Sequence, residues 1–174
     1  MRAARGIVLV GLLALALRPE LSRLRGEHAL HGGSGALRFV LTHPGEISDP
    51  SAALGRIAAV ALEAAGGLPA DPRPWILAGS ARLVAGETDR AVEAYRTAMA
   101  LGERAETDLN LGRAFDAQGE VEKSRGAYVR AGWISPALLP LLLPDVAEPV
   151  AREVARLEAE LRAGRLEAPP PMPR

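Results

Sequence analysis

Two stretches of the chain repeat one another: ILAGSARLVAGETDRAVEAYRTAMA at residues 76–100 and LNLGRAFDAQGEVEKSRGAYVRAGW at residues 109–133. A shift of 33 residues aligns Gly79 with Gly112 and Tyr95 with Tyr128. Self-similarity at a fixed period of about 20–50 residues is the signature of a repeat architecture. The matched residues are mostly small or aromatic, which predicts that helix backbones approach closely and that a ring fills the adjacent space.

Start and stop signals divide this region into short helices. Helix starts are predicted at the Asp-Pro pairs 49–50 and 71–72 and at the capping threonines Thr88 and Thr107. Glycines following the apolar runs predict left-handed helix ends. The expected helices span 50–65, 72–85, 88–101, 107–119 and 121–133. Because such short connections force antiparallel neighbours, the fold class expected is an all-α solenoid of helix hairpins.

The two units resemble the tetratricopeptide repeat over about residues 72–136. The family's signature positions are matched by Trp75, Gly79, Ala91, Tyr95 and Ala98 in the first unit (72–104), and by Leu111, Gly112, Phe115, Tyr128, Ala131 and Pro136 in the second (105–136). The second unit departs from the family where Asp108 or Leu109 replaces the tryptophan and where Ser124 replaces an alanine.

The resemblance implies a groove, lined by the first helix of each unit, that binds peptides of partner proteins. The family's clamp for a terminal carboxylate is not expected, because Ile76 and Ser80 occupy two of its positions. The alternative is an ordinary solvated helix surface. The partner-binding residues that the resemblance implies are Arg73, Ile76, Ser80, Leu83, Glu106, Leu109, Asn110, Arg113 and Asp116.

Two repeats leave an apolar face open at each end, so capping elements are expected. The helix 50–65 is expected to cover the first end. A helix at 149–163, with valines and leucines on one face and charges elsewhere, is expected to cover the second. The apolar segment before it has two interpretations, an internal cap or a docking patch for a membrane complex or bilayer. That patch comprises Leu138, Leu139, Leu141, Leu142 and Leu143.

The N-terminus has the layout of an export signal. Arg2 and Arg5 precede an apolar run at 6–17, which makes 1–18 a cleaved signal peptide or an uncleaved membrane anchor. Either interpretation places the rest of the chain outside the cytoplasm of a bacterium, in the periplasm or at the inner membrane. Residues 19–48 are expected to be a linker, with a short helix and then a break at 32–35. The domain follows at 49–164, and the proline-rich tail 165–174 is expected to be disordered.

The amino-acid composition argues against several classes of function. The 21 basic and 21 acidic residues balance, which argues against nucleic-acid binding. Because the chain has no cysteine, thiolate metal sites and cysteine catalysis are excluded. The three histidines are expected in exposed linker positions, and no metal site, cofactor or catalytic residue is predicted. Arginine accounts for 20 of the 21 basic residues, which is typical of a GC-rich bacterial genome.

These features favour a non-enzymatic scaffold for protein–protein interaction in a bacterial cell-envelope assembly. The alternative is an accessory subunit bound permanently to an integral membrane complex through its N-terminal helix. In both hypotheses the partners are other proteins, with the inner membrane as a further contact if residues 6–17 are retained.

Overall fold

A computed structural model describes the backbone of residues 2–166 and the side chains of residues 17–166. Over that part the chain is all-α and contains no strand, which confirms the predicted fold class at this level. The elements are α1 (Arg2–Thr42), η1 (Pro44–Glu46), α2 (Pro50–Gly67), α3 (Arg73–Val84), α4 (Thr88–Leu101), α5 (Ala105–Ala117), α6 (Val121–Ile134), η2 (Pro136–Leu141) and α7 (Pro144–Arg162).

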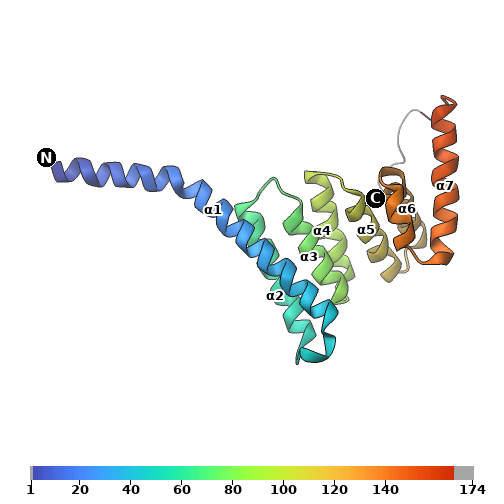
Figure 1. The fold of residues 1–174 in the computed structure, drawn as a ribbon, viewed down its shortest axis with the longest axis horizontal. Coiled ribbons are helices and arrows are strands. Elements are labelled where there is room, and N and C mark those ends of the chain that lie inside the picture. The colour runs from blue at the N-terminus through green and yellow to red at the C-terminus, as the bar shows by residue number, and fades with distance from the viewer. Residues whose placement is uncertain (1, 167–174) are drawn as a thin grey trace.

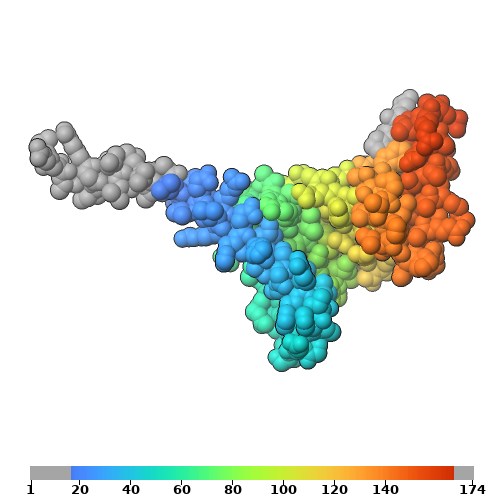
Figure 2. All heavy atoms as spheres, viewed as in Figure 1, coloured from blue at the N-terminus to red at the C-terminus, as the bar shows by residue number. Residues whose placement is uncertain are grey.

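The helices pair as hairpins that stack in chain order (Figure 1). α1 packs on α2, α3 on α4 and α5 on α6, and α7 packs on α6 at the far end. The arrangement resembles a solenoid, because each hairpin contacts chiefly the hairpins before and after it. The first half of α1 extends away from the other helices, on the side opposite α7 (Figure 1). In the space-filling view the coloured part of α1 begins at the side of the molecule opposite α7 (Figure 2).

The repeated glycine–tyrosine pairs lie where the helices of a hairpin cross. A Cβ built on Gly79 would lie 2.7 Å from Cε1 of Tyr95, and Tyr95 is fully buried. Gly112 meets the ring of Tyr128 in the same way one repeat later. The prediction that these glycines permit the closest helix approach is confirmed.

Two of the predicted glycine turns have the expected geometry, whereas two predicted caps are wrong. Gly86 and Gly119 adopt φ values of +79° and +76°, the left-handed conformation that glycine tolerates best. Thr88 is the first helical residue of α4 rather than its cap, which is Glu87. Thr107 lies inside α5 and is buried, because that helix already begins at Ala105.

The expected linker at 19–48 is instead mainly helix. α1 runs through Pro19 and through the glycine-rich segment 32–35 without interruption. Its buried residues recur every three or four positions, the spacing of one helix face. This buried face packs on the second and third helices and outweighs the weak helix propensity of glycine. The residues are Gly26, Leu30, Gly33, Leu37 and Val40.

The C-terminal cap is longer than predicted. α7 begins at Pro144, five residues before the expected start, and Pro149 lies within it. Proline at position 149 removes one backbone hydrogen bond. Burial of Val150 and Val154 against the core residues Leu109 and Tyr128 compensates for that loss.

Two predictions concern the ends of the chain, namely the disordered C-terminal tail and the N-terminal membrane segment. Residues 167–174, most of the expected disordered tail, lie outside the described residues. Over the described part of the chain, none of the helices has both the length and the apolar character of a membrane span.

Candidate partner-binding groove

A groove of about 710 Å³ lies along the first helices of the three hairpins. α1 forms one side and α3 the floor, and Arg104 and Glu106 at the start of α5 form the other side. That volume lies within the range of about 300–1,000 Å³ typical of ligand pockets. The residues lining this concave groove are Glu27, Leu30, His31, Ser34, Leu37, Arg38, Leu41, Arg73, Ile76, Leu77, Ser80, Arg104 and Glu106.

The structure brings four of the nine predicted partner-binding residues together in this groove: Arg73, Ile76, Ser80 and Glu106. The first three project from successive turns of α3, the middle of the three first helices. The four come from two hairpins, as expected for a groove that crosses repeat boundaries.

The other five predicted residues do not line this groove. Leu109 is buried beside α6 and α7, so its assignment to an exposed groove is wrong. Leu83 packs against the core between α4 and α5. Arg113 donates to Asn110 Oδ1 at 3.1 Å and to the carbonyl of Leu141 at 3.3 Å.

Asp116, the last of the nine, organises the α5–α6 hairpin. Its carboxylate accepts hydrogen bonds from the hydroxyls of Ser124 and Tyr128. Burial raises the pKa of the Tyr128 phenol, and the charge of Asp116 acts in the same direction. Asp116 therefore stabilises the α5–α6 packing.

Seven groove residues belong to α1 and lie in the segment expected to be a linker. A sequence signal for the helix that carries them exists, because Leu30, Leu37 and Val40 have the spacing of one helix face. The glycine-rich segment 32–35 weakens this helix signal, because glycine has a low helix propensity. Of the three glycines in that segment, only Gly33 packs closely, since a Cβ there would lie 2.9 Å from Cδ2 of Leu77.

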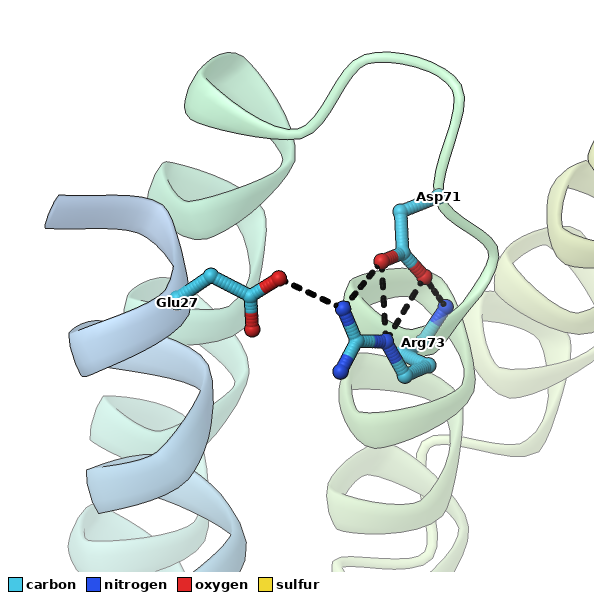
Figure 3. A network of polar contacts seen from close by, with 3 residues as sticks. All are labelled: Glu27, Asp71 and Arg73. Atoms are coloured by element: carbon cyan, nitrogen blue, oxygen red, sulfur yellow. Dashed lines mark hydrogen bonds and ion pairs between the residues drawn. The ribbon is translucent and has the colours of Figure 1, made fainter. Parts of the chain in front are cut away.

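An ion cluster joins the first two hairpins at one end of the groove (Figure 3). The Arg73 guanidinium donates to Glu27 Oε1 at 2.7 Å and to Asp71 Oδ2 at 2.8 Å. The Arg73 hydrogen bonds hold the pKa of the Asp71 carboxyl below its usual value. The Arg73 and Glu27 side chains are partly exposed, so the cluster positions α1 against α3 more than it adds to stability.

The predicted docking patch divides into two parts. Leu138, Leu139 and Leu142 pack against the core under α7, which matches the internal-cap interpretation. Leu141 and Leu143 are 58% and 70% exposed. The first three leucines therefore act as structural residues, and only the last two remain available at the surface.

Asp108 is the most unusual polar residue in the described structure. Its side chain is fully buried, and neither carboxylate oxygen has a hydrogen-bond partner among the described residues. Burial raises the pKa of this carboxyl to about 7, and the nearby charge of Glu103 acts in the same direction. Asp108 occupies the position that Trp75 holds one repeat earlier.

The described residues offer no metal centre. No group of three or more histidine, aspartate or glutamate side chains is placed there to hold an ion. His31 lines the groove, whereas His28 faces a separate hollow between α1 and α2. His43 stacks on Phe39 with 4.6 Å between ring centroids.

No family model, curated protein or solved structure matches this chain.

Proposed function

We propose that this chain is a non-enzymatic scaffold of a bacterial cell-envelope assembly, whose concave groove holds a segment of a partner protein. The observation that carries the proposal is the groove itself, which crosses three successive hairpins. Its apolar residues, such as Leu37, Leu41 and Ile76, lie beside charged ones, the mixture found at recognition surfaces. The tetratricopeptide-like repeat supports this role, because arrays of that kind bind peptides on the same helices.

The proposal places the chain at the inner membrane, with the groove outside the cytoplasm. The apolar run 6–17 would tether the chain, and α1 continues from it as one helix to Thr42. About nine residues separate Arg18 from Glu27 at the groove, which is roughly 14 Å of helix. Such a link would hold the groove close to the bilayer surface.

A second function is favoured by the exposed part of α1. Leu17, Leu21 and Leu24 are 48%, 51% and 64% exposed, although they are large and apolar. Their spacing of four and three places them along one side of the helix. This leucine row would suit an accessory subunit that packs permanently against a helix of a membrane complex.

Affinity purification of the full chain from native membranes in mild detergent tests the proposal. Ser34 is exposed on the groove side of α1, so Ser34→Trp should block the groove without disturbing the core. Ser51→Trp is the matched control, since Ser51 is exposed at the start of α2 and does not line the groove. Loss of the co-purified protein in the first variant alone is expected.

The same purification separates the two functions. If the accessory-subunit function holds, Leu21→Glu with Leu24→Glu removes the partner and Ser34→Trp does not. Equal recovery of the partner with both tryptophan variants would contradict the groove function. Alkaline phosphatase fused after Arg174 tests the location, because this enzyme is active only outside the cytoplasm.

A further inference from the structure

Two of the three arginines that line the groove lie outside its ion cluster. Of its arginines, Arg73 is occupied by Asp71 and Glu27. Arg38 and Arg104 form no ion pair within the described part of the chain. These two arginines are therefore available to a ligand.

The formal charges around the groove balance, because the three arginines are matched by Glu27, Glu106 and the neighbouring Asp71. Glu106 is the one lining carboxylate outside the Arg73 cluster, and His31 can add a further positive charge at low pH. Arg38 and Arg104 are nevertheless positive charges without an ion-pair partner among the described residues, so each favours an anionic group of a ligand at its own position.

The two arginines lie toward opposite ends of the groove. Arg104 follows Gly102 by two residues, and a Cβ on Gly102 would lie 4.0 Å from Cγ of Pro72, next to Arg73. Arg104 therefore lies at the end where Arg73 and Glu27 meet. Arg38 is eleven residues beyond Glu27 on α1, which corresponds to about 16 Å along the helix. An extended chain advances about 3.3 Å per residue, so roughly five residues span that distance.

The surface between the ends is apolar with a few hydroxyls. Ile76 is half-buried and lines it beside Leu30, Leu37 and Leu77, which are only 5%, 9% and 7% exposed. An apolar side chain of a ligand would therefore contact chiefly Ile76 there. Ser80 lies among them, with its Oγ accepting a hydrogen bond from the Tyr95 hydroxyl at 3.2 Å. The Ser80 hydroxyl therefore keeps its own proton to donate to a peptide carbonyl.

We infer that the occupant of the groove is an extended segment of a partner protein with two acidic side chains, four or five residues apart, that flank apolar residues. The acidic side chains pair with Arg38 and Arg104, and the apolar residues lie on the surface around Ile76. This inference rests on the proposed function, since it specifies the chemistry of the segment that the groove binds.

Selection from random peptides displayed on phage tests this inference with the full chain held in mild detergent. Enrichment of sequences with two acidic residues at that spacing around apolar ones supports it. Enrichment of neutral or basic sequences that Ser34→Trp abolishes would overturn the inference and leave the proposed function standing. The absence of any enrichment that depends on Ser34 would overturn both.

A pair of charge-reversing substitutions tests the role of the two arginines directly. The double variant Arg38→Glu with Arg104→Glu should bind the enriched acidic peptide about tenfold more weakly or worse, because two charge-assisted contacts become repulsive. Arg125→Glu is the matched control, since Arg125 is exposed on α6 and does not line the groove. Fluorescence anisotropy of the labelled peptide measures both variants, and unchanged binding by the double variant would contradict the inference.

Discussion

Tyr95 packs its ring directly against the backbone of Gly79. A Cβ at position 79 would lie 2.7 Å from Cε1 and 2.9 Å from Cδ1 of that ring, closer than side chains come in folded proteins. The Tyr95 hydroxyl donates to Ser80, the next residue along α3. This crossing fixes the first repeated hairpin, and Gly112 with Tyr128 builds the second in the same way.

The close packing of Tyr95 on Gly79 predicts that a larger side chain at position 79 lowers the free energy of unfolding. Gly79→Leu should lower the free energy of unfolding by about 1–3 kcal/mol or more, because the ring cannot move out of its buried site without displacing α4. Urea denaturation followed by circular dichroism measures the change. Gly32→Ala is the control, since a Cβ there has nothing within 4 Å and should stabilise the helix by about 0.5–1 kcal/mol. Equal stability of Gly79→Leu and the wild type would contradict the packing.

The continuity of α1 predicts how its glycines respond to proline. Gly35→Pro should cost about 3 kcal/mol or more, because a proline inside a helix removes a hydrogen bond and clashes with the preceding turn. Gly35→Ala should stabilise by about 0.5–1 kcal/mol, since nothing lies within 4 Å of a Cβ there. Urea denaturation of both variants provides the measurement. If residues 32–35 were a linker, the proline would be tolerated.

The repeats could be predicted from the sequence because their signals are local. A glycine at each turn, short apolar runs and a tyrosine at a fixed offset from Gly79 define the hairpins without reference to the rest of the chain. α1 could not be predicted in the same way. Its glycines and Pro19 weaken the local helix signal, and the helix is held by long-range contacts with α2 and α3.

The same difference between local signals and long-range contacts explains which groove residues could be predicted from the sequence. Arg73, Ile76 and Ser80 follow from the register of α3, which the repeat establishes. Leu109 was misplaced because the spacing of α5 alone does not show that η2 and α7 close over that end of the array. Arg38 and its neighbours were missed together with the helix that carries them.

Asp108 predicts a pH dependence of stability. In the folded chain the pKa of this carboxyl is raised to about 7, whereas in the unfolded chain it is near 3.8. The folded chain therefore binds this proton more tightly than the unfolded chain does. The resulting contribution to the free energy of unfolding is fully present below about pH 4 and is lost as the pH rises through 7. Asp108→Asn removes the titration, so this variant should gain on the order of 1–3 kcal/mol relative to the wild type between pH 5 and pH 8. Urea denaturation at the two pH values measures the difference, and parallel behaviour of the two proteins would contradict it.

The cap formed by α7 predicts unequal effects of two valine substitutions. Val150 is 2% exposed against the core of the α5–α6 hairpin, and Val150→Ala should cost about 1–3 kcal/mol through lost burial and a small cavity. Val121→Ala is the control, because Val121 is 67% exposed at the start of α6 and should change stability by less than about 0.5 kcal/mol. Thermal denaturation compares them. Equal effects would mean that α7 does not cap the array.

Site-specific photocrosslinking in cells of the source organism tests whether the concave groove contacts a partner protein. A photoreactive amino acid is placed at Ser34 in the groove or at Ser51 outside it, in the full chain. Irradiation should produce a discrete, heavier adduct from position 34 and none from position 51. The absence of an adduct at position 34, or the same adduct from both positions, would contradict the proposed function of the groove.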